Sequence, residues 1–150
     1  MLTAVKKILV PIQGHKADEA AFRIACRISR DNKGKLFALH VIEVDQRLPV
    51  DSELPVQTAS GEVILERIEV LGHAEKCIVE ADIVQARRAG PAIVQESIDK
   101  QVELLILGVP FKSRFGSGAL GQAAIYVLTN SICPVILWKE PAPSDSNMVT

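Results

Sequence analysis

Glycines and cations that could hold an anion are concentrated in residues 108–122, GVPFKSRFGSGALGQ. A glycine lets a backbone N–H approach a phosphate oxygen with no side chain in the way, and a lysine or arginine adds a charge-assisted hydrogen bond. A helix that begins near Gly121 would add the positive end of its dipole. The segment therefore has the means to bind phosphate. Its glycines are Gly108, Gly116, Gly118 and Gly121, and its cations are Lys112 and Arg114.

The same segment has a purely structural explanation. It separates two apolar runs, ELLILG and AAIYVL, and glycines are common wherever a chain turns from a strand into a helix. The bulky ring of Phe111 also lies within it, where a triphosphate would need space. Both readings, an anion site and a plain turn, stay open.

Two histidines and two arginines are weaker candidates for ligand contacts. His15 lies in the loop after the first apolar run and could contact phosphate, whereas His40 lies within an apolar run and is expected to be a satisfied core residue. Arg87 and Arg88 follow a predicted strand, and we expect them to be a solvated pair.

No set of residues has a recognisable catalytic spacing. The sequence lacks a serine, histidine and acid at a nucleophile elbow, and it lacks a pair of carboxylates at a catalytic distance. No general base is placed beside residues 108–122. We therefore expect a protein that is not an enzyme, and ATP hydrolysis is the least favoured function.

The three cysteines do not form a metal-binding pattern. Cys26, Cys77 and Cys133 are widely separated, and each lies in an apolar neighbourhood. The pattern predicts buried, reduced thiols and no metal site.

Length and charge limit the location and the partners. A chain of 150 residues with 48 % hydrophobic and 23 % charged residues suits one domain with a real core. A net charge of -1 disfavours nucleic acid and anionic membranes as partners. The apolar runs are far shorter than the ~20 residues of a membrane span, and Pro11 interrupts any signal-peptide pattern. We expect a cytoplasmic protein without direct membrane insertion.

Short apolar runs alternate with amphipathic segments along the whole chain. The runs predict buried strands, with the partly polar run at 78–86 on an edge of the sheet; the strands lie near 6–12, 35–44, 78–86, 102–108 and 133–138. The amphipathic segments predict helices near 18–31, 61–76, 89–101 and 119–131. Asp18 could cap the first helix, and the two prolines of residues 45–61 predict a long loop there.

Strict alternation of strands and helices predicts an α/β domain with a parallel sheet covered on both faces. Ligands of such sheets bind at the carboxyl ends of the strands, near the point where strand order reverses. The loops at 11–17, 42–60 and 108–121 are therefore the places to search for a site.

These elements, in this order, resemble the universal stress protein family from Lys6 to about Trp138. The resemblance is carried by KKILVPI, LHVIEV, GPAIVQES, LLILG and YVLTNSICPVILW. It implies a single Rossmann-like domain over residues 1–140 with a five-stranded parallel sheet. It also implies a homodimer formed through the last strand, Pro134 to Trp138. The polar composition of residues 141–150 predicts a disordered tail after the domain.

The resemblance also implies a nucleotide site. Family members that bind nucleotide carry G-x2-G-x9-G-[S/T] after the fourth strand, and here these positions are Gly108, Phe111, Gly121 and Gln122. The family's aspartate at the end of the first strand is replaced by Gln13. Because Gln13 has no charge and Gln122 is not a usual magnesium ligand, we do not expect magnesium-ATP bound in the family's usual manner.

Two functional hypotheses follow. In the first, a stress-response regulatory domain binds ATP, ADP, AMP or a cyclic dinucleotide, and its site residues are Pro11, Gln13, Val41, Gly108, Arg114, Gly121 and Gln122. The base would lie at the backbone of Val41 and the ribose near Pro11 and Gln13. In the second, the chain binds no nucleotide and acts as a dimeric interaction module, with a partner such as a transporter.

Overall fold

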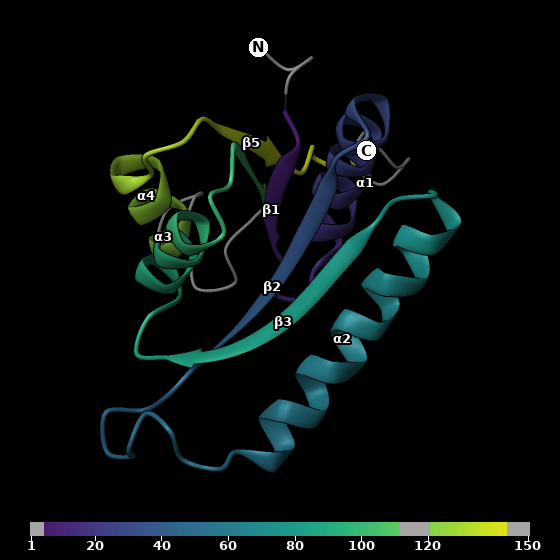
Figure 1. Cartoon of the computed structure of the whole chain (residues 1–150). Helices are drawn as coiled ribbons and strands as arrows, with labels where there is room; N and C mark the ends of the chain where they lie inside the picture. Colours follow the sequence, from purple (N-terminus) through teal and green to yellow (C-terminus); the bar gives the residue numbers. More distant parts are fainter. Residues whose placement is uncertain (1–4, 112–120, 144–150) are drawn as a thin grey trace, which may run out of the picture.

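The computed structural model describes residues 5–111 and 121–143, in which strands and helices alternate (Figure 1). The elements are β1 (Lys7–Pro11), α1 (Lys16–Asn32), β2 (Lys35–Glu43), α2 (Pro55–Ala74), β3 (Val79–Ala86), α3 (Ala89–Asp99), β4 (Leu104–Val109), α4 (Gly121–Asn130) and β5 (Val135–Lys139). The predicted order of elements is confirmed.

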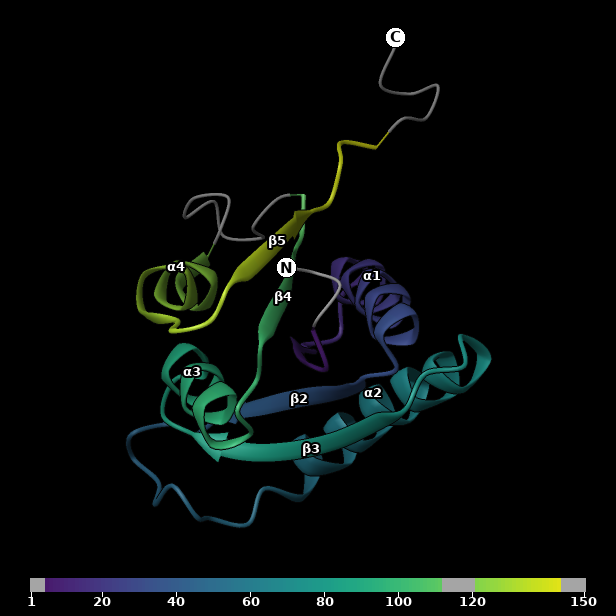
Figure 2. The same ribbon diagram turned by 45° about the horizontal axis from the view of Figure 1, so that its top comes forward.

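All strand pairings in the sheet are parallel, and the strand order is β3-β2-β1-β4-β5. The order runs outward from β1 in both directions, so strand order reverses between β1 and β4. Figure 2 shows β5 and β3 at the two ends of the sheet, as the sequence predicted for β3. The α/β fold with a five-stranded parallel sheet is confirmed.

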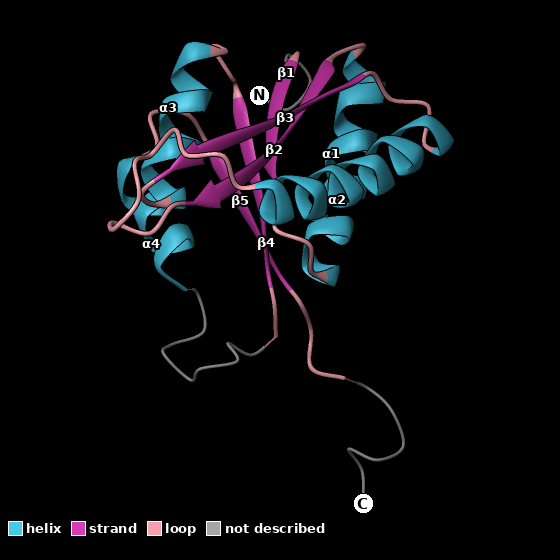
Figure 3. Cartoon of the chain, turned by 90° about the horizontal axis from the view of Figure 1, so that it is seen from below, coloured by secondary structure: helices cyan, strands magenta, loops and turns pink. Residues whose placement is uncertain are grey.

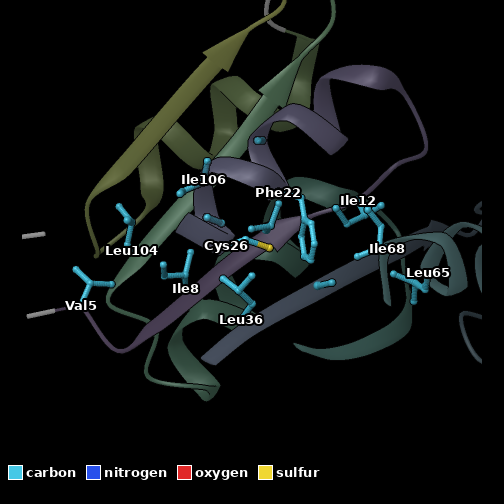
Figure 4. Close-up of a cluster of buried hydrophobic side chains, with 14 residues drawn as sticks. Val5, Ile8, Ile12, Phe22, Cys26, Leu36, Leu65, Ile68, Leu104 and Ile106 are labelled. Atoms are coloured by element: carbon cyan, nitrogen blue, oxygen red, sulfur yellow. The ribbon is translucent and has the colours of Figure 1, made fainter. Parts of the chain in front are cut away.

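Helices cover both faces of the sheet. Figure 3 shows α1 and α2 on one face and α3 and α4 on the other. Because side chains alternate along a strand, Ile8 and Val10 of β1 enter the cluster under α1 and α2, whereas Leu9 enters the cluster under α3 and α4. Figure 4 shows the first cluster, in which Phe22 of α1 lies over the sheet. The central strand β1 thus has both of its faces buried, whereas the edge strands β3 and β5 are half-buried.

Helix α2 begins at Pro55, six residues before the predicted start at Gly61. The prediction was wrong because Pro55 was taken as a helix breaker. Proline at the first helical position costs no hydrogen bond, since that N–H has no partner within the helix. The loop between β2 and α2 is correspondingly shorter than predicted.

Several close contacts within the fold depend on glycines, among them Gly72 and Gly90. A methyl group at Gly72 of α2 would lie 2.6 Å from Val79 Cγ2 and 3.3 Å from Phe22 Cζ. One at Gly90 of α3 would lie 2.7 Å from Tyr126 Cβ of α4. The absence of a side chain at Gly72 allows α2 to pack closely on α1 and β3.

The predicted burial of all three thiols is only partly correct. Cys26 is buried on the inner side of α1, but Cys77 and Cys133 are half-buried. Cys77 lies in the turn between α2 and β3, and Cys133 lies in the loop between α4 and the edge strand β5. Of the predicted tail, residues 141–143 are exposed and residues 144–150 lie outside the described part of the chain.

Candidate functional site

The carboxyl ends of β1 and β4 separate at the point where strand order reverses. Their pairing joins Ile8 to Leu104 and Leu9 to Leu105. Yet β1 continues to Pro11 and β4 to Val109. The two strands are not paired over these last residues, and both end at the edge where parallel α/β sheets bind ligands.

The backbone of Val41 points to the β1 side of the sheet, beyond the end of β1. In a parallel sheet, alternate residues direct their N–H and C=O groups to opposite neighbours. On the β1 side, the Ile12 N–H donates to the Leu39 carbonyl at 2.8 Å; on the β3 side, the Val44 N–H donates to the Ala86 carbonyl at 2.8 Å. Val41 follows Leu39 by two residues, so its N–H and C=O point to the β1 side, past the end of that strand.

The loop between β1 and α1 is organised by Asp18. Its carboxylate Oδ2 accepts hydrogen bonds from the N–H groups of Gln13 at 2.6 Å, Gly14 at 2.8 Å and His15 at 3.3 Å. His15 is the N-cap residue of α1, and Asp18 is the third residue of the helix. Asp18 therefore caps α1 as predicted, but from the third helical position in a capping box with His15. It also uses N–H donors that could otherwise face an anion.

Burial sets the electrostatics of Asp18. The residue is 2 % exposed, and burial raises the pKa of its carboxyl group. His15 and the three backbone N–H groups act in the opposite direction on that pKa without overcoming burial. The imidazole Nδ1 of His15 lies 3.4 Å from Asp18 Oδ1. The sequence analysis predicted the cap but not the hydrogen bonds to the loop, although an acid three residues into a helix after a glycine was the available signal.

Gly108 lies in β4 directly beneath the first turn of α1. A methyl group there would lie 2.2 Å from the Ala17 carbonyl oxygen and 2.9 Å from the Asp18 backbone nitrogen. The absence of a side chain at Gly108 is therefore required for packing, whatever ligand the edge binds.

Phe111, at the family's second glycine position, is tied to the end of β5. Its N–H donates to Glu140 Oε1 at 3.0 Å, and Lys139 Nζ donates to its carbonyl at 3.3 Å. Lys139 Nζ also lies 4.9 Å from the centre of the phenyl ring. Phe111 is not among the described non-glycine residues with positive φ, so it fits this position without adopting a conformation that requires glycine.

Gly121 and Gln122 form the start of α4. Gly121 has φ of +73°, and no atom of the described residues lies within 4 Å of where its side chain would begin. Gln122 is exposed. Arg114, together with Lys112, Gly116 and Gly118, lies outside the described residues.

The weaker candidates have structural roles where the structure describes them. His40 is buried, and its Nδ1 lies 2.7 Å from the Ile12 carbonyl, which confirms the expectation of a satisfied core histidine. Arg87 and Arg88 are both exposed, as expected for a solvated pair. In addition, Nη1 of Arg87 donates to the carbonyls of Asp45 and Leu48, each at 2.7 Å. The sequence did not predict these hydrogen bonds, because Asp45 and Leu48 lie about forty positions before Arg87 in the chain.

A cavity of about 260 Å³ opens beside the β1–α1 loop, between α1 and α2. Arg67 of α2 reaches across to Glu19 of α1, with Nε and Oε1 separated by 3.0 Å. The cavity has an apolar floor of Ile12, Ile64 and Ile68, and its rim includes His15, Lys16 and Arg67. The sequence analysis did not identify it, because its two walls come from distant segments.

A five-stranded parallel sheet whose strand order reverses between β1 and β4, with helices on both faces (Figure 3), defines a single-domain α/β protein with a Rossmann-like fold. Residues 4–139 match the family model described as the universal stress protein family, and the chain belongs to that family. None of the helices within the described residues is both long and apolar enough to cross a membrane.

Relatives of the chain are distant but cover most of its length. The universal stress protein MJ0531 of Methanocaldococcus jannaschii is 22 % identical over 142 residues, which are 91 % of this chain and 83 % of that protein. A universal stress protein from Archaeoglobus fulgidus in complex with dAMP has a TM-score of 0.70 at 16 % identity, covering 89 % of this chain and 98 % of the other.

A third similar protein, from Arabidopsis thaliana, belongs to the same family and was solved with AMP bound. Its TM-score is 0.67 at 21 % identity, covering 93 % of this chain and 97 % of the other. At these identities the structural comparisons establish a shared fold.

Proposed function

We propose that this chain is a stress-response regulatory domain that binds an adenine nucleotide at the separated ends of β1 and β4. The observation that carries the proposal is the direction of the Val41 backbone. A peptide N–H and C=O side by side match the ring nitrogen acceptor and amino donor of adenine. The ribose would lie near Pro11 and Gln13, and the phosphate near Gly108, Arg114, Gly121 and Gln122.

A nucleoside monophosphate is the ligand class that these residues favour. Family relatives carry AMP and dAMP, as their descriptions state. Three loop N–H donors are already used by Asp18, and Phe111 occupies the position of a phosphate-loop glycine. With Gln13 and Gln122 in place of an acid and a hydroxyl residue, a short phosphate without magnesium fits better than magnesium-ATP.

Calorimetry with AMP, ADP, ATP, cyclic AMP and a cyclic dinucleotide, each with and without magnesium, tests this function. We expect AMP to bind with an affinity that magnesium does not change. Gln122→Ala should weaken binding, while Gln57→Ala on exposed α2 should leave it unchanged. Absence of heat with every nucleotide would refute the proposal.

A second candidate is a protein-interaction module without nucleotide, such as one that regulates a transporter. The capture of the loop N–H groups by Asp18 favours it, because these donors no longer face the candidate site. Purified protein that retains a nucleotide through gel filtration, seen as excess absorbance near 260 nm, excludes this candidate.

We further propose that the chain acts by binding rather than by catalysis, in the cytoplasm, and as a homodimer. Strand β5 has an open edge, and its residues from Val135 to Trp138 are half-buried in the single chain. Exposed apolar side chains lie close to it in sequence, with Ile132 at 77 % and Leu128 at 44 % exposure. Pairing of two β5 edges would cover unpaired backbone groups and this apolar surface together.

A further inference from the structure

Helix α1 contacts the end of α2 and the turn after it through residues on one side of α1. Near the middle of α1, the Phe22 ring lies against Gly72 and would be 3.3 Å from a methyl group there. Two turns later, Arg30 Nη1 donates to the Glu75 carbonyl at 2.6 Å. The residue between them on the same side of α1 is Cys26.

Cys77 is the residue of the turn that meets Cys26. It follows Glu75 by two positions, and its Sγ lies 3.9 Å from the Glu75 carbonyl, on the side of the turn that faces α1. It packs against the buried cluster that contains Cys26 (Figure 4). The interaction between the two thiols is also among the causes that shift the pKa of each. Two thiols from segments far apart in sequence are thus held together by the contacts on either side of them.

We propose that Cys26 and Cys77 form a dithiol pair that peroxide oxidises to an intrachain disulfide joining α1 to the α2–β3 turn. The pair is independent of the nucleotide site, so it does not rest on the function proposed above. Cys133 is not part of it, because it packs in the cluster on the opposite face of the sheet.

The more exposed thiol reacts first. Cys77 is half-buried and Cys26 is fully buried, so the Cys77 thiolate attacks one peroxide oxygen, breaks the O–O bond and becomes a sulfenic acid. The Cys26 sulfur then attacks the Cys77 sulfur and displaces hydroxide, which leaves as water with the proton from Cys26. Overall, the two thiols lose two protons and two electrons, and one peroxide becomes two water molecules.

The reaction should be faster at alkaline pH, because the thiol pKa values are raised and only the thiolate reacts. Burial raises the pKa of both thiols. Charged groups facing the pair are Arg30 on α1, which lowers both values, and Glu75 at the end of α2, which raises both. Below the pKa of Cys77, the thiolate fraction and hence the rate rise about tenfold per pH unit.

Peroxide treatment of the full reduced chain at pH 7 and pH 9 tests the pair. We expect intact mass spectrometry to show the loss of two hydrogens, faster at pH 9, and non-reducing peptide mapping to join the Cys26 and Cys77 peptides. Dithiothreitol should reverse the change. Cys133→Ala should behave as the wild type, whereas Cys77→Ala and Cys26→Ala should form no cross-link.

A second measurement distinguishes the cross-link from surface oxidation. Because the disulfide closes a long loop, the oxidised chain should have a Tm higher by roughly 5 °C, and the rise should vanish on reduction. The proposal fails if Cys77 passes to sulfinic acid while Cys26 remains alkylatable after unfolding. It also fails if the cross-link involves Cys133 or a second chain, or if none forms at pH 9.

Discussion

Gly108 of β4 lies so close to Ala17 of α1 that a methyl group on the glycine would be 2.2 Å from the Ala17 carbonyl oxygen. The first turn of α1 therefore rests directly on the β4 backbone. This contact brings the β1–α1 loop beside the end of β4, and both border the candidate nucleotide site. Gly108 matches a glycine of a phosphate-binding motif, but the packing of α1 on β4 alone already requires glycine at this position.

Gly108→Ala should destabilise the fold by about 1–3 kcal/mol, because neither the strand nor the helix backbone can move away freely. Urea unfolding measures the loss. Gly121→Asn is the contrasting variant, since asparagine tolerates positive φ and no described atom lies near that position. It should leave the unfolding midpoint nearly unchanged. Equal midpoints for wild type and Gly108→Ala would contradict the packing role.

Asp18→Asn should change how stability depends on pH. Because burial raises the folded-state pKa of Asp18, its protonation contributes stability that is fully present below the unfolded value of 3.8 and is lost as pH rises through the folded pKa. The asparagine variant lacks this titration. The stability of the wild type minus that of Asp18→Asn should thus decrease from pH 4 toward pH 7 in urea titrations. An increase over that range would mean that the three N–H bonds outweigh burial.

Arg87→Ala should loosen the loop between β2 and α2. The guanidinium donates to the carbonyls of Asp45 and Leu48 at 2.7 Å and reaches that of Val44 at 3.4 Å. Loss of these bonds should speed amide hydrogen exchange in residues 45–50 by about tenfold. Its exposed neighbour gives the matched control, Arg88→Ala, for which we expect no change. Similar exchange in both variants would show that Arg87 does not hold the loop.

Ile132→Asp should convert the proposed homodimer to a monomer, because it places a charge beside the β5 edge. Val56→Asp is the control, since Val56 lies on α2 and has the same exposure of 77 % as Ile132. Sedimentation velocity should show a dimer for the wild type and for Val56→Asp, and a monomer for Ile132→Asp. A wild-type chain that sediments as a monomer would refute the dimer itself.

The sequence by itself determined the class of fold and predicted the region of the candidate site. Unbroken apolar runs such as LLILG can only be buried on both faces, and their alternation with amphipathic segments requires crossover helices and a parallel sheet. The loops after such strands meet at one edge, so residues 11–17 and 108–121 were identified as site loops. The predicted start of α2 was wrong, because the helix begins at Pro55. Proline breaks a helix in its interior but is tolerated at the first helical position.

Only the tertiary structure decided which backbone and side-chain groups are available at that edge. Three contacts depend on how the end of one element is placed against another. They are the hydrogen bonds of Asp18 to three loop N–H groups, the contact of Gly108 with Ala17, and the hydrogen bond of Phe111 to Glu140. The pairing of Cys26 with Cys77 has the same origin. Some of these contacts join residues far apart in the chain, and others depend on the conformation of a single turn. Hydrophobic periodicity does not predict them, because it indicates which face of an element is buried but not which residues pack against that face.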